Sequence, residues 1–287
     1  MTAPSTDAWE IALIDSAWHG SELEGPRGLV RAREIGYEAA DLFVGFDPAR
    51  MSAGERASYV EGVRDAGLPV LSVVCTCLGL SDFNPAVRGY HIERACAVVD
   101  LAAEFDTARN LLFVPGEYMF QQRLLPHESE WELVVDATRR VGERAAAHGL
   151  EVAIELLPFE FAFVSTLDDL ERLLDAVDLP NVKAAVDISH LWLQRIEPHQ
   201  LERFAGRIAQ VHVADCDGDN HGDLPPGRGT TPFPVYLEAL ERVGYHGSAS
   251  IELEFPRDGQ PVEEWVAEAF TATRRLLADG GQRPDLA

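Results

Sequence analysis

The sequence has 287 residues, of which 46% are hydrophobic and 25% charged, as expected for a globular protein with a large core. Its 48 acidic and 24 basic side chains give a formal charge of −24 at pH 7, which argues against a nucleic-acid partner because phosphate binding requires Lys and Arg. Four cysteines are too few for a disulfide scaffold, and the first residues lack the features of a signal peptide. The longest nearly apolar run, 68–80, is too short to cross a bilayer, so we expect a cytoplasmic protein without a membrane partner.

Segments with strand character alternate along the chain with segments of helical periodicity. In chain order, the expected strands cover residues 10–18, 39–44, 69–77, 110–114, 151–156, 182–187, 208–213 and 249–252. Apolar residues spaced by three and four positions indicate helical segments between them. These segments lie at about 29–36, 52–66, 92–99, 131–149, 166–177, 198–204, 235–243 and 262–277.

The alternation of short apolar strands with helices indicates a parallel sheet covered by helices. Eight such repeats favour one closed (β/α)8 TIM barrel over an open doubly wound sheet. No G-x-G-x-x-G follows the first strand, so the dinucleotide-binding version lacks its main support. We therefore expect a single barrel domain over 9–280, with a flexible N-terminal tail over 1–8 and a C-terminal tail over 281–287.

Four successive strands in the second half of the chain end in a carboxylate or an imidazole, at Glu155, Asp187, His212 and Glu252. A single residue of this kind often caps the next helix. Because the carboxyl ends of barrel strands converge on the active site, four in consecutive repeats instead predict a divalent metal site. Three carboxylates and one imidazole suit Mn²⁺, Mg²⁺ or Co²⁺ better than an ion that prefers thiolates.

Several motifs surround these residues, most clearly between residues 150 and 255. They are Ala-Ile-Glu155, Asp187-Ile-Ser-His190, Val-His212-Val-Ala-Asp215, Pro226-Gly-Arg-Gly229 and Ser-Ile-Glu252. As an ordered set they resemble the sugar phosphate isomerase/epimerase superfamily of xylose-isomerase-like TIM barrels. That group includes ketose 3-epimerases, hydroxypyruvate isomerases, inosose dehydratases and isomerases, and endonuclease IV.

The resemblance implies that the four strand-end residues bind one divalent ion, usually Mn²⁺. It also implies that Glu155 and Glu252 remove and return a proton on the two faces of the substrate, through an enediolate that the cation stabilises. His190 matches the family histidine that binds a substrate oxygen, with a packed, purely structural histidine as the alternative.

A second substrate contact is less clear, because the arginine that the epimerases carry soon after the metal-binding histidine is missing here. The segment contains His221 and, later, Arg228, and either could bind a substrate oxygen. Glu254 has the same strand parity as Glu252 and is the rival ligand, although the Ser-Ile-Glu motif favours Glu252. Asp215 is expected to have a structural role.

These observations predict a metal-dependent isomerase or epimerase of a keto sugar or keto-cyclitol. The alternative is a lyase at the same site, namely an inosose or dehydroshikimate dehydratase or an enzyme that cleaves 3-keto-glycosides, because all of these remove a proton beside a carbonyl. The charge and the single set of metal ligands argue against a nuclease. The expected partner is a small carbohydrate or cyclitol; family members often form dimers or tetramers, which leaves a homo-oligomer open.

Overall fold

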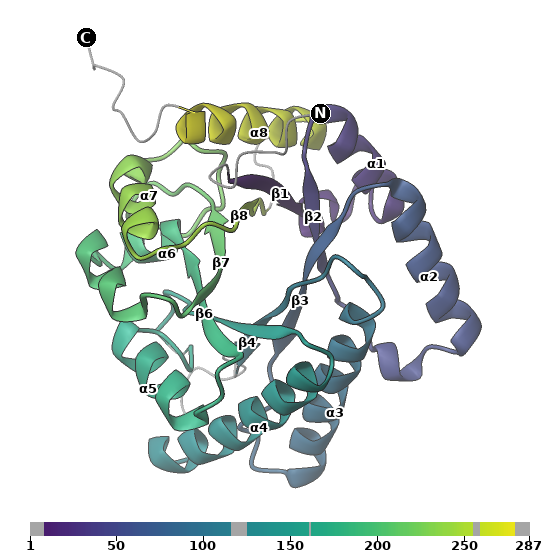
Figure 1. The fold of residues 1–287 in the computed structure, drawn as a ribbon, viewed down its shortest axis with the longest axis vertical. Helices are drawn as coiled ribbons and strands as arrows, with labels where there is room; N and C mark the ends of the chain where they lie inside the picture. The colour runs from purple at the N-terminus through teal and green to yellow at the C-terminus, as the bar shows by residue number, and fades with distance from the viewer. Residues whose placement is uncertain (1–8, 116–124, 161, 255–258, 279–287) are drawn as a thin grey trace.

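The computed structural model describes residues 9–115, 125–160, 162–254 and 259–278. Within these residues eight parallel strands pair in the order β1 to β8, and β8 pairs with β1, so that the sheet closes on itself. The helices form a ring outside the strands (Figure 1). The single (β/α)8 barrel predicted from the sequence is confirmed. The two predicted tails, 1–8 and 281–287, lie outside the described residues.

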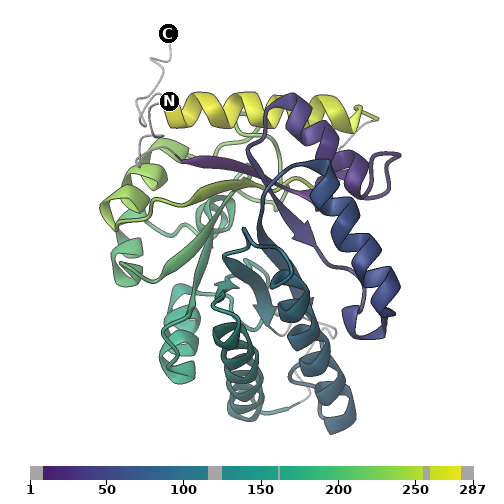
Figure 2. The same cartoon turned by 45° about the vertical axis from the view of Figure 1, so that its right-hand side comes forward.

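The strands are short and each is followed by helical structure. The strands are β1 (Glu10–Ile14), β2 (Ala39–Phe43), β3 (Val70–Cys77), β4 (Asn110–Pro115), β5 (Glu151–Glu155), β6 (Val182–Asp187), β7 (Ile208–Val213) and β8 (Ser248–Ile251). The α-helices are α1 (Pro26–Ile35), α2 (Ala53–Ala66), α3 (Pro85–Ala102), α4 (His127–Ala147), α5 (Leu167–Val177), α6 (Ile188–Leu193), α7 (Phe233–Arg242) and α8 (Val262–Ala278). Figure 2 shows α8 beside α1, so the last helix completes the ring next to the first.

Two expected elements differ from the structure. The expected strand over 10–18 ends at Ile14, and Asp15–Trp18 form a short 3-10 helix instead. The Asp15 carboxylate accepts the backbone N–H of Phe43 at 2.6 Å, while Trp18 turns inward and becomes fully buried. The expected helix over 198–204 is also a 3-10 helix, in which Pro198 takes the first position.

One helix was not expected from the sequence. The helix α6 begins directly after β6, and its N-cap is Asp187, whose carboxylate accepts the backbone N–H groups of Ser189 and His190. Its six residues are too few to show a helical period in the sequence. The cap matters for function because it fixes the orientation of the Asp187 side chain.

The inside of the barrel contains a buried polar layer beneath the predicted metal site. The hydroxyl of Ser72 donates to Asp41 at 2.7 Å, and the amide of Gln210 donates to Ser72 at 3.1 Å and to Asp41 at 3.3 Å. Side chains two residues apart on a strand point to the same face, so Gln210 lies one layer below His212 on β7. The layer therefore closes the floor of the barrel with polar groups that are hydrogen-bonded to one another, apart from Oε1 of Gln210, which is buried without a partner.

All four cysteines are free thiols, and three of them are buried. The absence of a disulfide agrees with the low cysteine count. Among the described helices, none combines the length and the apolar character needed to cross a membrane.

Candidate metal centre and active site

The four strand-end residues meet at the carboxyl ends of β5 to β8. Asp187 and His212 are register partners in the β6–β7 pair, and Glu155 ends β5. Glu252 directly follows β8, one residue beyond the end of that strand. One ligand atom from each of the four side chains lies within 4.8 Å of the others. The pairing of the strands therefore brings together the four residues that the sequence predicted to form one site.

His212 is the centre of this cluster. Its Nδ1 atom lies 2.9 Å from Oε2 of Glu252 and 3.1 Å from Oε1 of Glu155. Burial alone would lower the pKa of His212, but the negative charges of Glu252 and Glu155 raise this pKa well above its ordinary value. Burial raises the pKa of Glu252, against the opposing effect of His212. In the metal-free protein, a protonated imidazole thus compensates part of the negative charge.

The unpaired atoms of the cluster are those that a cation would bind. Asp187 uses Oδ1 to cap α6, and its Oδ2 is buried without a hydrogen-bond partner. Oε1 of Glu155 is likewise buried without a hydrogen bond of good geometry, although it forms an ion pair with Nδ1 of His212 at 3.1 Å. A buried carboxylate oxygen without a donor is costly, and oxygen ligands with one imidazole suit a divalent ion. The residues therefore fit the cation that the sequence predicted.

Electrostatics keep Asp187 ionised in this position. Burial alone would raise the pKa of Asp187, but His190, His212 and the donor groups of the α6 N-terminus lower it below its ordinary value. Burial alone would lower the pKa of His190, but the negative charges of Asp187 and Glu155 outweigh burial and raise this pKa. The charges of the two residues of the Asp-x-x-His motif thus stabilise each other.

His190 lies at the pocket with a defined ring orientation. It is 3% exposed, and its Nδ1 lies 2.9 Å from the carbonyl oxygen of Leu156. A carbonyl oxygen only accepts, so Nδ1 carries the hydrogen. The other nitrogen, Nε2, lies 3.0 Å from Nε2 of His221.

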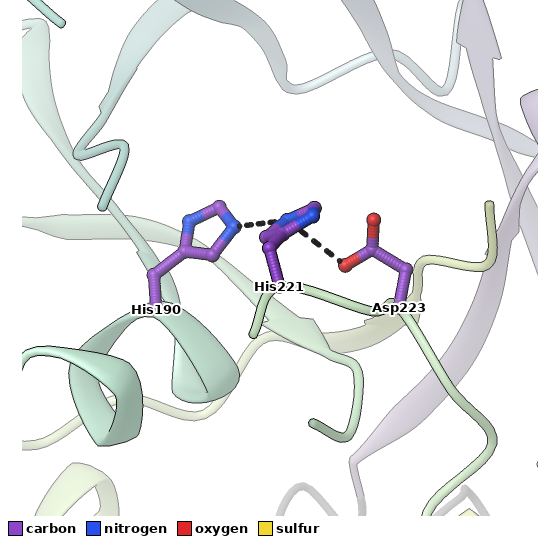
Figure 3. A group of neighbouring side chains, drawn as sticks. All are labelled: His190, His221 and Asp223. Carbon is purple, nitrogen blue, oxygen red and sulfur yellow. Dashed lines mark hydrogen bonds and ion pairs between the residues drawn. The ribbon is translucent and has the colours of Figure 1, made fainter. Parts of the chain in front are cut away.

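His221 and Asp223 come from the long segment between β7 and α7. Nε2 of His221 lies 3.3 Å from Oδ1 of Asp223, so that His221 stands between His190 and Asp223 (Figure 3). Burial raises the pKa of Asp223 well above its ordinary value, and the nearby Glu252 and Asp187 raise it further. These three residues form a second group with the donor atoms and spacing of a metal site.

The second group was not expected from the sequence, which singled out His190 and His221 but not Asp223. The His-x-Asp spacing of His221 and Asp223 was the only local signal, and it lay in a segment rich in acidic residues. One of the two arguments from the sequence against a nuclease was that it showed a single set of metal ligands. Because the structure contains two such groups, this argument no longer holds. The argument from the charge of −24 is unchanged.

The structure does not bring Arg228 to the pocket. Its guanidinium binds both carboxylate oxygens of Glu268 on α8, at 2.6 and 2.7 Å, and lies 4.5 Å from the centre of the Trp265 ring. A bidentate pair combined with ring stacking holds an arginine firmly in place. Of the two alternatives for the second substrate contact, only His221 lines the cavity.

Asp215 organises the segment that carries His221 and Asp223. Its carboxylate accepts four backbone N–H groups, those of Cys216, Gly227, Gly229 and Thr231, at 2.8 to 3.0 Å. A β-carbon at Gly229 would lie 2.1 Å from the carbonyl oxygen of Cys216, so only glycine fits there. Asp215 thus has the structural role expected for it.

A cavity of about 320 Å³ opens above the cluster and has two unlike sides. The polar side comes from the second half of the barrel and consists of Glu155, His190, His221, Asp223, Glu252 and Glu254. The opposite side comes mainly from β2, β3 and β4, and its residues are Phe43, Val74, Thr76, Leu112 and Val114, with Leu157 and Phe159 completing it. Among the described residues that line the cavity there is no Lys or Arg.

A barrel with a cluster of carboxylates and an imidazole at the carboxyl ends of its strands is typical of one class of proteins, and comparison with known families identifies that class. The family model described as "Xylose isomerase-like TIM barrel" matches residues 29–276. The chain therefore belongs to this family.

Individual relatives are similar over part of their length. D-psicose 3-epimerase of Ruminiclostridium cellulolyticum is 29% identical over 132 residues, 45% of this chain and 43% of that protein. Inosose dehydratase of Geobacillus thermodenitrificans is 23% identical over 187 residues, 59% of this chain and 61% of that protein. The chain thus spans about half the length of the curated relatives it matches.

Among solved structures, that of the IolI protein with a zinc atom has a TM-score of 0.79 at 17% identity. The match covers 94% of this chain and 98% of that one. At this identity the likeness shows the shared fold.

Proposed function

We propose that the protein is a divalent-metal-dependent isomerase or epimerase of a keto sugar or keto-cyclitol. The observation that carries the proposal is the convergence of two glutamates, the buried Glu155 and the partly buried Glu252, on one imidazole at the edge of a small-molecule cavity. Both curated relatives have names that denote carbohydrate or cyclitol chemistry, and epimerisation and dehydration can each begin with removal of a proton beside a carbonyl.

Glu155, Asp187, His212 and Glu252 would hold the ion, which we propose to be Mn²⁺, with Mg²⁺ or Co²⁺ as alternatives. When bound, such an ion polarises a substrate carbonyl and stabilises the negative charge that develops on its oxygen. The zinc atom in the IolI structure supports a divalent ion in this family without identifying the ion used here.

The protein's own groups would move the proton. Glu155 and Glu252 both line the cavity, so one carboxylate can take a proton from the substrate carbon while the other returns it. The raised pKa of Glu252 suits a group that must both hold and release a proton near neutral pH. His190 and His221 face the same cavity and would bind substrate oxygens.

The cavity favours an unphosphorylated substrate. Its described lining includes six polar or acidic side chains on one side but no Lys or Arg to neutralise a phosphate. The apolar side, which includes Val74, Leu112 and Val114, would pack against the C–H face of a sugar or cyclitol ring.

A lyase at the same site is the second candidate. It is favoured by the similarity to inosose dehydratase and by His221, which stands at the cavity beside the carboxylate of Asp223. A dehydratase needs a group that protonates the departing hydroxyl, and a histidine in this position could serve as that acid.

One experiment separates the two. The metal-loaded protein is incubated with ketoses and inososes in D₂O, and the products are followed by NMR and ultraviolet absorption. An epimerase incorporates deuterium at the carbon beside the carbonyl without loss of water. Formation of an absorbing enone would contradict the isomerase and favour the lyase. Loss of neither proton nor water with any of these substrates would argue against both.

A further inference from the structure

His212 has one ring nitrogen that does not face the predicted metal site. Nδ1 faces the carboxylates of Glu155 and Glu252, so it is the nitrogen that would bind the ion. Nε2 carries a hydrogen both in the protonated imidazole and in an imidazole that binds a metal through Nδ1. This nitrogen is buried and has no hydrogen-bond partner among the described residues. A histidine that binds a metal usually donates this second hydrogen to an oxygen, which fixes the orientation of the ring.

Ser250 is the neighbour of His212 in the sheet. The two residues are register partners in the β7–β8 pair, so their side chains point to the same face of the sheet. The hydroxyl of Ser250 is completely buried and also lacks a hydrogen bond of good geometry. Buried polar groups are rarely left unpaired, and a hydroxyl can accept one hydrogen while it donates its own. The serine can therefore supply the oxygen that Nε2 of His212 requires.

The carboxylate of Asp41 lies beside Ser250. Each layer of side chains inside a (β/α)8 barrel takes one residue from every second strand. The registers of the β8–β1 and β1–β2 pairs place Ser250 and Asp41 in one such layer, and the residue of β1 that pairs with Ser250 is the small Ala12. Burial raises the pKa of Asp41, whereas the hydroxyls of Ser250 and Ser72 and the charge of His212 lower it. Ser250 is thus close to Asp41 as well as to His212.

Asp41 is held in place by the polar layer on the floor of the barrel. Its Oδ1 accepts the hydroxyl hydrogen of Ser72 at 2.7 Å, and its Oδ2 accepts the amide of Gln210 at 3.3 Å. The residue is fully buried, so solvent does not compete for these oxygens. A carboxylate offers about four lone-pair sites, which leaves room for a third donor. Asp41 is therefore a fixed acceptor for the hydroxyl of Ser250.

We propose that Ser250 and Asp41 are positioning residues for the metal-binding histidine. The hydroxyl of Ser250 accepts the hydrogen of Nε2 of His212 and donates its own hydrogen to Asp41, so that the carboxylate acts on the imidazole through the serine. These two bonds fix the ring and make Nδ1 a stronger ligand. This inference rests on the proposed function, because it requires an ion at Nδ1. It also gives a role to the serine of the Ser-Ile-Glu252 motif, which the proton transfer itself does not use.

Metal affinity tests the proposal without any assay of activity. Binding of Mn²⁺ is measured at one fixed pH from the electron paramagnetic resonance signal of the free ion. We expect Ser250→Ala to bind Mn²⁺ about 10- to 100-fold more weakly than the wild-type protein, as is usual for changes behind a metal ligand. Ser72→Ala is the matched control, because it removes the other hydroxyl beside Asp41, on a strand that does not pair with β7. Its affinity should stay within about twofold, while urea titrations show similar losses of stability in both variants.

Nuclear magnetic resonance of the imidazole reads the hydrogen bond itself. In protein labelled with ¹⁵N-histidine and saturated with diamagnetic Mg²⁺, the ring of His212 should carry its hydrogen on Nε2, with the proton shift and slow exchange of a hydrogen-bonded group. In Ser250→Ala this proton should move upfield and exchange faster, whereas Ser72→Ala should leave it unchanged.

The possible failures can be told apart. Wild-type affinity in Ser250→Ala, or equal weakening in Ser250→Ala and Ser72→Ala, would overturn the positioning role and leave the proposed function intact. A loss in Gln210→Met without one in Ser250→Ala would also overturn it, because Oε1 of Gln210 is the other buried oxygen of this layer without a partner. Failure of the wild-type protein to bind Mn²⁺, Mg²⁺ or Co²⁺ would instead overturn the proposed metal centre, and the positioning role with it.

Discussion

The two halves of this barrel have the same architecture but contribute different chemistry to one cavity. At the carboxyl ends of strands β5 to β8 lie Glu155, Asp187, His212, which is the last residue but one of β7, and Glu252, which directly follows β8. Strands β2 to β4 contribute chiefly apolar side chains, such as Val74, to the opposite side. The repeated βα unit therefore does not by itself determine the site; the residues at the carboxyl ends of the strands do.

Two aspartates, one in each half of the barrel, show how the different surroundings change the pKa of a carboxyl group. Asp15 follows β1 and Asp187 ends β6, and each accepts a backbone N–H with its carboxylate. Burial raises the pKa of Asp15 to about 7, with a further contribution from Asp41. Asp187 has a lowered pKa because His190 and His212 lie beside it. Similar strand ends thus give a carboxyl group that keeps its proton up to about pH 7 in one half and an ionised carboxylate in the other.

Removing a carboxylate from the cluster in the second half of the barrel should have the largest effect. In Glu252→Gln the carboxylate that contacts His212 becomes a neutral amide, so both metal binding and proton transfer are impaired. We expect kcat/KM to fall about 10³- to 10⁴-fold on the substrate identified by the D₂O experiment. Glu155→Gln should behave alike.

Glu254→Gln is the control, because Glu254 lines the same cavity and has the same strand parity. It should keep kcat/KM within about tenfold and bind metal normally. A greater loss in Glu254→Gln than in Glu252→Gln would reassign the ligand to Glu254.

The four residues of the strand-end cluster, Glu155, Asp187, His212 and Glu252, were predictable from the sequence for a physical reason. A parallel strand buried on both sides reads as an apolar run, so the residue at which the run stops is visible without a structure. Closure of the barrel then brings such ends together, which is why Glu155, Asp187 and His212 could be named as neighbours. The apolar side of the cavity was not visible in this way, because pocket and core positions have the same residue types.

The residues between β7 and α7 could not be placed by the same reasoning. Arg228 was a plausible substrate contact, but its partner Glu268 lies 40 positions away on α8. Asp223 was overlooked because its orientation depends on Asp215 and on the β-bridge to Leu224, which have no periodic signal. Long loops are organised by such individual contacts, whereas strands and helices are organised by repeating patterns.

The tight packing of this loop predicts a loss of stability in Gly229→Ala. The added methyl group would collide with the backbone of Cys216 and with the Asp215 carboxylate, so the loop must shift. We expect the free energy of unfolding to fall by about 1–3 kcal/mol in urea titrations. The matched control in the first half is Gly54→Ala in α2, where nothing lies within 4 Å. That change should leave stability equal or raise it by up to about 1 kcal/mol, and an equal loss in both variants would contradict the assigned packing.

The stability of the protein should depend on pH through Asp15, the aspartate that follows β1 in the first half of the barrel. With a pKa of about 7 in the folded protein and an ordinary value of 3.8, Asp15 keeps a proton that the unfolded chain loses between about pH 4 and 7. The stability that this neutral group contributes is therefore lost as the pH rises through that range. Asp15→Asn stays neutral and can still accept the N–H of Phe43.

Three pKa units correspond to about 4 kcal/mol, but Asp15 is only half-buried in its surroundings, so we expect solvent to reduce the effect to about 1–2 kcal/mol. Denaturation at several pH values should show Asp15→Asn equal to the wild-type protein near pH 4 and more stable above pH 7. A constant difference across this range would mean that Asp15 ionises normally.

The smallest effect should come from the apolar side of the cavity, which two reciprocal exchanges can test. Val114 on β4 and Thr76 on β3 both line it, and valine and threonine have nearly the same shape. Val114→Thr places a hydroxyl where the substrate would pack, which we expect to cost about 1 kcal/mol and raise KM about fivefold. Thr76→Val should change KM less than about twofold.

Both variants should bind the wild-type amount of metal and keep kcat within about twofold, because the groups that move the proton lie on the other half of the barrel. A drop in kcat without a change in KM would show instead that the apolar side takes part in the chemical step, and that the division of the cavity into a reactive and a packing side is wrong.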